Sequence, residues 1–219
     1  RQKQTEKCHR GTTHCPTGAE RNHQATALKK ACRVMGYSLG KSSWGFLAKL
    51  LGVARTTTAD GMRHMAESTE EPSLAGDLHA IDVDAMWHVL PSKKLWIINA
   101  VDHGTGRTRA WVRGGRDAAT CQRVYDTVKH LTDCCLYTDN WDVCAKGLPK
   151  ERQSIGQAST HAIERDNSHT RHHRARMTRK TKVVSKSEDM LHASLKLWCA
   201  LNVPAIFEKY QALFLSIFT

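Results

Sequence analysis

Apolar residues recur at a helical spacing in the N-terminal part of the chain. Residues 27–35 predict one helix, ended by the glycine that follows them. Trp44–Leu51 predicts a second helix, because a serine pair directly before it supplies a capping hydroxyl. A third helix is expected over 56–67. Together these segments predict a small all-α domain over 25–67, after a polar segment at 1–24 that has few apolar anchors.

The join between the second and third helices has the features of a helix-turn-helix. Gly52 permits a tight turn, and Ala48, four residues earlier, leaves room for the two helices to approach. In this motif the later helix enters the major groove of DNA. We therefore predict that the residues that open the third helix face DNA, namely Arg55, Thr56, Thr57 and Thr58. An ordinary helical hairpin is the alternative to DNA binding.

Beyond the third helix the pattern changes from helical to strand-like. Residues 68–77 are polar and contain Pro and Gly, which indicates a linker. Residues 79–87 alternate between apolar and polar positions, and 95–101 are apolar throughout. After a glycine-containing turn, 108–113 form the return strand. Three consecutive strands are therefore predicted.

A helix and a fourth strand follow. Asp117 is placed to cap the helix, whose apolar face consists of Cys121, Val124, Val128 and Leu131. Residues 134–138 form a short apolar strand, and helices come after it. This order predicts an α/β domain over 78–202. The apolar run over 203–219 predicts a C-terminal docking helix.

The charge distribution favours a nucleic-acid partner. Lys and Arg total 33 against 21 acidic residues, for a formal net charge of +12. A surplus of this size favours a polyanion, and it is clustered, because 165–186 hold eight basic residues and one acid. Apolar runs fall short of the about 18 residues of a membrane span, and no secretory signal is visible. We expect a cytoplasmic protein that binds double-stranded DNA and no membrane.

Four acidic residues occupy positions that suit metal-dependent phosphoryl transfer. Asp82 and Asp84 are two residues apart in the first strand and therefore share a face. Asp139 follows the fourth strand directly, at the carboxyl end where α/β sheets place their sites, and Glu164 lies further on. Mg²⁺ takes oxygen ligands, and two such ions activate the attacking oxygen and stabilise the leaving one. Each acid alone suits an exposed turn, strand or helix; their order together favours a two-metal site.

Basic residues continue from Glu164 along one predicted helix face. Glu164, Asn167, Arg171 and Arg174 recur at a helical spacing, so a carboxylate that holds metal would be followed by groups that grip phosphates. We predict DNA contacts for Asn167, Arg171, Arg174, Arg176, Arg179, Lys180 and Lys186. A solvated charge run is the alternative, which the near absence of acids disfavours.

These residues resemble the insertion sequence one transposases, a bacterial family with an Asp-Asp-Glu triad in an RNase H-like core. The likeness extends from about residue 25 to residue 202 and rests on three motifs: Asp84-Ala85-Met86-Trp87, Tyr137-Thr138-Asp139-Asn140-Trp141 and Ile163-Glu164-Arg165-Asp166-Asn167. In the family the first Asp stands three residues before a Trp. The resemblance therefore selects Asp84 over Asp82.

The resemblance implies an RNase H-like mixed sheet with flanking helices and an upstream helix-turn-helix that recognises element ends. It implies that Asp84, Asp139 and Glu164 are catalytic and hold two Mg²⁺ ions, or Mn²⁺ in their place. The implied activity is cleavage at the ends of an insertion sequence and joining of the freed 3′-hydroxyl to target DNA. Bringing two ends together implies a homo-oligomer, at least a dimer on DNA.

The N-terminal segment departs from the family pattern. Members commonly carry a zinc finger built from two Cys-Xaa-Xaa-Cys pairs, whereas this chain has Cys8, His9, His14 and Cys15 without such a pair. We interpret residues 1–24 as a finger remnant and do not expect bound Zn²⁺.

Two alternatives to a transposase remain open. An RNase H-like nuclease would cut DNA without joining strands, although the helix-turn-helix and the basic stretch favour the transposase. A non-catalytic helix-turn-helix DNA-binding protein would use residues 25–67, and its DNA binding would survive Asp139→Asn.

Overall fold

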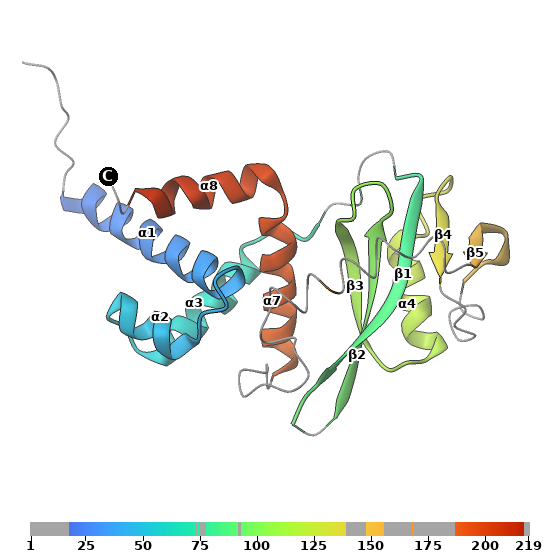
Figure 1. Ribbon diagram of the computed structural model, residues 1–219, viewed down its shortest axis with the longest axis horizontal. Helices are drawn as coiled ribbons and strands as arrows, with labels where there is room; N and C mark the ends of the chain where they lie inside the picture. Colours follow the sequence, from blue (N-terminus) through green and yellow to red (C-terminus); the bar gives the residue numbers. More distant parts are fainter. Residues whose placement is uncertain are drawn as a thin grey trace, which may run out of the picture.

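A mixed sheet of five strands forms the centre of one half of the molecule (Figure 1). The computed structural model describes residues 18–72, 74, 78–91, 93–138, 148–155, 168 and 187–216, with the backbone alone for 18–25. The described strands are β1 (Ala80–Val89), β2 (Lys94–Asp102), β3 (Thr108–Gly114), β4 (Cys135–Thr138) and β5 (Gln153–Ile155).

The strand order across the sheet is β3-β2-β1-β4-β5. Strand β2 pairs antiparallel with β1 and β3, whereas β4 pairs parallel with β1 and β5. An antiparallel meander of three strands, whose first strand also pairs in parallel with the fourth, is typical of the RNase H-like fold. The predicted fold class is therefore confirmed, with β1 in the middle of the sheet.

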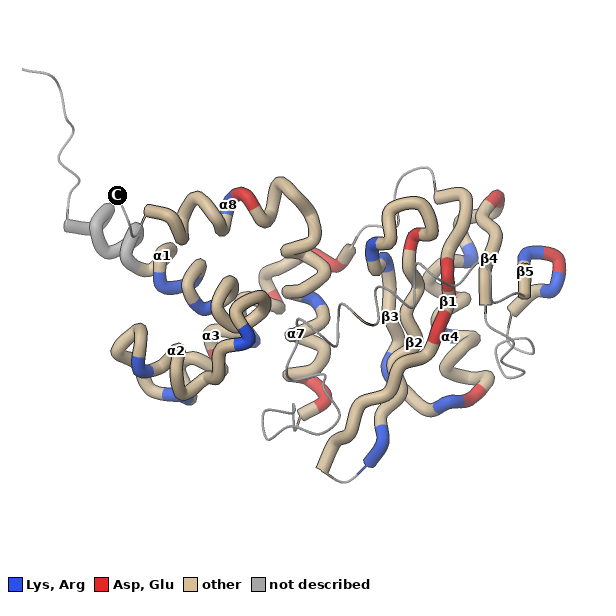
Figure 2. The backbone as a smooth tube through the Cα atoms, viewed as in Figure 1, with Lys and Arg blue, Asp and Glu red and all other residues tan. Residues whose placement is uncertain are grey.

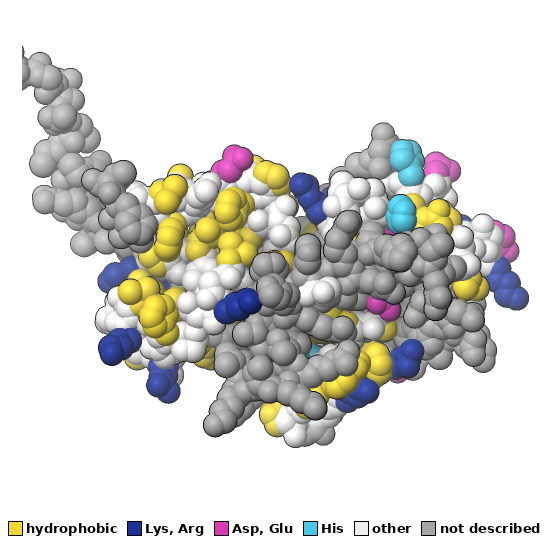
Figure 3. Space-filling model, in the orientation of Figure 1, with side chains coloured by type: hydrophobic (Ala, Val, Ile, Leu, Met, Phe, Trp, Pro, Cys, Tyr) yellow, Lys and Arg dark blue, Asp and Glu magenta, His cyan; other side chains and the backbone are white. Residues whose placement is uncertain are grey.

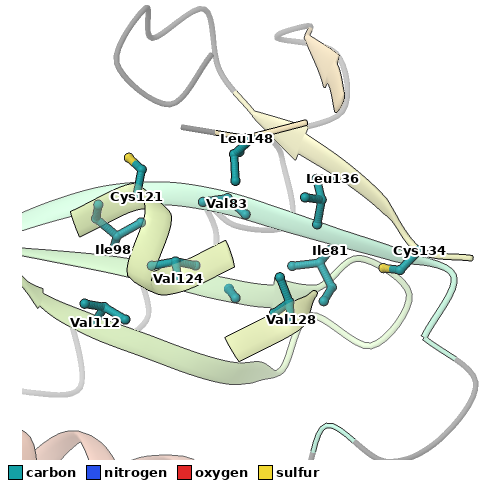
Figure 4. Packing of buried hydrophobic residues seen from close by; sticks show 11 residues of the cluster. Ile81, Val83, Ile98, Val112, Cys121, Val124, Val128, Cys134, Leu136 and Leu148 are labelled. Carbon is teal, nitrogen blue, oxygen red and sulfur yellow. The ribbon is translucent and has the colours of Figure 1, made fainter. Parts of the chain in front are cut away.

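Helix α4 (Ala118–Val128) covers one face of the sheet. Asp117 caps it, because its carboxylate accepts a hydrogen bond from the Thr120 N–H at 2.8 Å. Alternate strand residues and one side of the helix form the main core (Figure 4), which includes Ile81, Val83, Ile98, Val112, Cys121, Val124, Val128 and Leu136. Odd-numbered residues of β1 therefore point toward α4.

Helix α7 (Glu188–Leu201) covers part of the opposite face. A second cluster joins this helix to even-numbered positions of β1 and odd-numbered positions of β2, and it contains Met86, Leu90, Leu95, Ile97, Leu191 and Leu195. The two faces of the sheet are thus buried by different helices, while the part of β1 that holds Asp82 and Asp84 lies outside this second cluster.

The other half of the molecule is helical. It contains α1 (Gly18–Ser38), α2 (Trp44–Leu51), α3 (Arg55–Glu67) and α8 (Pro204–Leu215), and α8 packs along α1. The core of this half includes Tyr37, Leu47, Met62 and Ala66 together with Met190, Ala193 and Leu197 of α7. Helix α7 therefore stands between the two halves and contributes to both (Figure 1).

Among the described helices, no single one is long and apolar enough to cross a membrane. In the described part of the chain, one pair of helices, α7 and α8, passes that test by length and composition when taken together, and the pair is bent by 95° at the break between them.

The first helix differs from its prediction. It begins at Gly18 and continues through Gly36 to Ser38, whereas 27–35 was expected. A Cβ atom added at Gly36 would lie 2.8 Å from Leu47 Cδ2. This glycine therefore allows α1 and α2 to approach closely and does not end the helix.

Strand β5 was not predicted from the sequence. It has three residues, too few to show alternation, and it is preceded by a short 3₁₀ turn over Lys150–Arg152. The helix that was expected to carry Glu164 and the basic residues after it lies outside the described residues, apart from the helical Ser168. The linker expected over 68–77 packs partly, since Leu74 contacts the α4 core.

Candidate active site

Asp84 lies in the middle of β1, on the sheet face opposite α4. Its neighbours Val83 and Ala85 point into the α4 core, so alternation directs Asp84 to the other face, where it is partly exposed. Asp84 pairs with Asn99 of β2, and Asn99 pairs with Trp111 of β3. The Ala85 N–H donates to Asp84 Oδ1 at 2.6 Å.

This row of residues ends at helix α7. The Trp111 Nε1–H donates to Nδ1 of His192 at 3.1 Å, and the centroids of the two rings lie 5.6 Å apart. Burial lowers the pKa of His192, and the positive charge of Arg113 lowers it further. His192 is therefore a neutral hydrogen-bond acceptor at the α7 end of the cross-strand row that begins at Asp84.

Strand β4 lies directly beside β1 with a parallel register. Val83 pairs with Thr138, the last residue of β4. Asp84 and Asp139 each follow a member of this pair in the sequence. Asp139 and Glu164 lie outside the described residues, as do the predicted DNA contacts Asn167, Arg171, Arg174, Arg176, Arg179, Lys180 and Lys186.

Asp82 is fully buried on the same face as Asp84. Its Oδ1 lies 2.9 Å from Nδ1 of His103, and the ring centroids of His103 and Tyr137 lie 5.0 Å apart. Its Oδ2 has no hydrogen-bond partner among the described residues. Burial raises the pKa of Asp82, and the hydrogen bond and charge of His103 oppose that rise in part. Asp84 is thus the more accessible of the two carboxylates.

The described donors suit a hard cation but do not form a complete site. Carboxylate oxygens at Asp84 and Asp82 are the kind of ligand that Mg²⁺ prefers. Within the described ranges, no three His, Cys, Asp or Glu side chains converge on a point that could hold a metal.

The His103–Asp82 pair was missed by sequence reasoning. His103 follows β2 in a segment that reads only as a turn, and it is 21 residues from Asp82 in the chain. Spacing carries no signal for this pair, because the contact depends on the folding of β2 back along β1.

The helix-turn-helix segment is present as two short helices joined by a tight turn. The Phe46 N–H donates to Ser43 Oγ at 3.1 Å, which caps α2. Gly52 ends that helix with φ 63° and ψ 37°, a left-handed conformation that favours glycine. Helix α3 then begins at Arg55, whose guanidinium group lies close to Gly45 of α2.

The residues that open α3 differ in exposure. Arg55, Thr56 and Thr57 are exposed, whereas Thr58 is fully buried. The Thr58 hydroxyl donates to the Ala54 carbonyl at 3.3 Å. The expectation that Thr58 faces DNA is therefore wrong, because this side chain lies on the buried face of the helix.

Comparisons with known proteins identify the family. An RNase H-like sheet with a carboxylate on its central strand defines the broad class of the protein. Residues 78–199, more than half of the chain, match the family model described as IS1 transposase, and the chain belongs to this family.

Two relatives show the extent of the similarity. The insertion element iso-IS1n protein InsB of Shigella dysenteriae is 28% identical over 111 residues, which is 50% of this chain and 85% of that protein. The insertion element IS1 protein InsB of Shigella flexneri is 29% identical over 111 residues, which is again 50% of this chain and 85% of that protein. One similar chain among solved structures comes from the cryoEM structure of a simian T-cell lymphotropic virus intasome in complex with PP2A regulatory subunit B56 gamma. The two chains superpose with a TM-score of 0.38 at 13% sequence identity, over 78% of this chain and 69% of that chain.

Proposed function

We propose that this protein is a DDE transposase that cleaves DNA at the ends of an insertion sequence and joins the freed 3′-hydroxyl to target DNA. Membership of the IS1 transposase family supports the reaction class. The observation that carries the proposal is the register of β1 and β4, which pairs Val83 with Thr138. Asp84 follows Val83 in the sequence and Asp139 follows Thr138, so this register supports the proposal that the two carboxylates serve one site.

We propose that Asp84, Asp139 and Glu164 are the catalytic residues and together hold two Mg²⁺ ions, with Mn²⁺ as a substitute. The family generally uses divalent metals, and the carboxylate donor set fits them. When bound, such ions supply Lewis-acid stabilisation of the attacking and leaving oxygens of a phosphodiester.

The sheet holds the backbone of Asp84 in a fixed position. Strand β1 pairs with β2 at Asp84 itself and with β4 up to Val83, the residue before it, so the backbone at Asp84 has little freedom. The hydrogen bond from the Ala85 N–H orients one carboxylate oxygen. A carboxylate on a doubly paired strand needs little reorganisation when substrate arrives.

DNA contacts are proposed at two places. Arg55, Thr56 and Thr57 are exposed at the start of α3 and would read or position double-stranded DNA at the element ends. The basic stretch between 165 and 186 would grip phosphates near the active site. Because two ends must be brought together, we also propose a homo-oligomer, at least a dimer on DNA.

The proposal predicts metal-dependent cleavage that the triad variants lose. A labelled duplex that carries the element ends is incubated with the parent or with Asp84→Asn, Asp139→Asn or Glu164→Gln, in Mg²⁺ or in EDTA at low salt. We expect each variant to lose cleavage by about a hundredfold or more while it still binds the duplex. Asp126→Asn is the matched control, because the Asp126 side chain is exposed on α4, which covers the sheet face opposite Asp84.

The three functional classes give different results in this assay. Cleavage by the parent with joined products supports the transposase, and cleavage without joining supports the nuclease. Salt-sensitive binding without cleavage by the parent points to a non-catalytic DNA-binding protein. Triad variants that cut as fast as the parent contradict the assignment of these three residues.

A further inference from the structure

Two tryptophans and two basic side chains gather on the sheet face opposite Asp84. Trp87 of β1 and Trp96 of β2 are cross-strand neighbours. Lys94 Nζ lies 4.3 Å from the ring centroid of Trp87 and 4.8 Å from that of Trp96. Arg116 Cζ lies 4.9 Å from the Trp96 centroid. These four residues are called the tryptophan patch below.

The face on which the patch lies follows from strand alternation. Ala85 and Ile98 form a cross-strand pair that points into the α4 core, and Trp87 and Trp96 form the next pair on that same face. The β1–β2 hairpin projects at this end of the sheet (Figure 1). The patch and Asp84 are therefore on different faces.

The patch is open to solvent. Neither indole ring is among the residues of the three buried clusters, and both rings are partly exposed. Lys94 and Arg116 are exposed. Basic residues mark the hairpin in Figure 2, and hydrophobic and basic side chains lie next to each other over this region in Figure 3. Large aromatic rings left partly uncovered beside cations indicate a binding surface.

The chemistry of the patch matches a nucleic-acid strand. Bases stack on aromatic side chains, and the adjacent phosphates are neutralised by Lys and Arg. Contact with duplex phosphates alone requires the cations but not the paired tryptophans. Among the described ion pairs, none joins Lys94 to an acid.

We propose that the tryptophan patch binds a DNA strand with unpaired bases, with a base stacked on the indole rings and phosphates held by Lys94 and Arg116. The flexible four-carbon stem of Lys94 allows its ammonium to move from above the rings to a phosphate, which opens a ring face to the base. Because the patch lies on the face of the sheet opposite Asp84, this proposal does not depend on the assignment of the catalytic residues.

The test compares two labelled single-stranded oligonucleotides of equal length and charge, one of mixed sequence and one with abasic positions at its centre. Binding to the full chain is followed by fluorescence anisotropy. We expect the parent to bind the mixed-sequence strand about tenfold more tightly than the abasic one. Trp96→Leu removes that preference, and Trp96→Phe retains part of it.

Lys94→Ala tests the phosphate contact. We expect it to reduce the slope of log K against log salt by about 0.7, the value for one phosphate on a single strand. Lys209→Ala is the matched control, since it removes one exposed positive charge from α8 in the other half of the molecule. Circular dichroism melting curves show whether each variant remains folded.

Three results overturn the proposal. The first is equal binding of both oligonucleotides by the parent. The second is a folded Trp96→Leu variant that keeps the preference for the mixed-sequence strand. The third is a salt slope for Lys94→Ala equal to that for Lys209→Ala. Loss of binding to anionic lipid vesicles in Trp96→Leu, with DNA binding unchanged, assigns the patch to a membrane surface instead. Asp139→Asn keeps the preference if the two sites are separate, so failure of the catalytic proposal and failure of this one are distinguishable.

Discussion

Asp102 illustrates how a single buried charge is stabilised in this fold. Its carboxylate, at the end of β2, accepts hydrogen bonds from Arg109 Nη2 at 2.8 Å, from the Thr105 hydroxyl at 2.6 Å and from the Gly104 N–H at 3.1 Å. Burial alone would raise the pKa of Asp102, but these donors together outweigh it and hold that pKa below the usual range. The charged form is therefore favoured in the folded protein.

Replacing Asp102 with Ala is expected to lower the free energy of unfolding at neutral pH by about 2–3 kcal/mol, because three hydrogen bonds to a buried carboxylate, including the one from Arg109, are lost. The depressed pKa means that Asp102 stabilises the fold above its unfolded pKa and loses this effect as pH falls through its folded pKa. Urea unfolding at neutral and acidic pH measures both. Asp126→Ala, which breaks only an exposed pair with Lys129, should cost less than about 1 kcal/mol; an equal cost for the two variants contradicts this account.

At the scale of elements, the turn between α2 and α3 depends on one backbone conformation. Gly52 has φ 63°, and a Cβ atom added there would meet nothing within 4 Å. Any cost of substitution therefore comes from the backbone and not from a clash. We expect Gly52→Ala to lower the free energy of unfolding by about 1 kcal/mol, because L-residues resist the left-handed region.

Gly52→Asn is the matched control for this turn, because asparagine tolerates the left-handed region better than alanine does. Thermal unfolding followed by circular dichroism compares the variants. Equal stability of Gly52→Ala and the parent would mean that the turn adopts another conformation.

At the scale of the whole molecule, helix α7 joins the two halves. Leu191 and Leu195 pack on the sheet, whereas Met190 and Leu197 pack on the N-terminal helices. The hydroxyl groups of Tyr37 and Ser194 lie 2.8 Å apart in the buried contact between α1 and α7. The sheet and the helical half therefore share one structural element.

We predict that the two halves unfold in one cooperative transition and that Leu191→Ala destabilises both by about 2–5 kcal/mol, the cost of a cavity at a fully buried leucine. Circular dichroism and tryptophan fluorescence should give coincident unfolding curves. Leu50→Ala is the control, since Leu50 is 61% exposed. Two separate transitions would show that α7 does not couple the halves.

Local pattern was sufficient for much of the fold. The spacing of apolar residues predicted α2, α3 and α4, and the Ser43 and Asp117 caps are where the sequence indicated. The strand pattern predicted β1 to β4 to within about two residues of their ends. Strand β5 was missed, because three residues are too few to show an alternation of apolar and polar positions. Their strand conformation follows from pairing with β4.

Neighbours in the chain were enough to predict most of the elements and their order, the basic character of the chain and the motif that favours Asp84 as a candidate. The tertiary fold established which side chains meet. It buried Thr58, paired Asp82 with His103, set Trp87 beside Trp96 and placed α7 between two cores. The physical reason is that strand register and helix packing join residues far apart in sequence, and no local pattern encodes those distances.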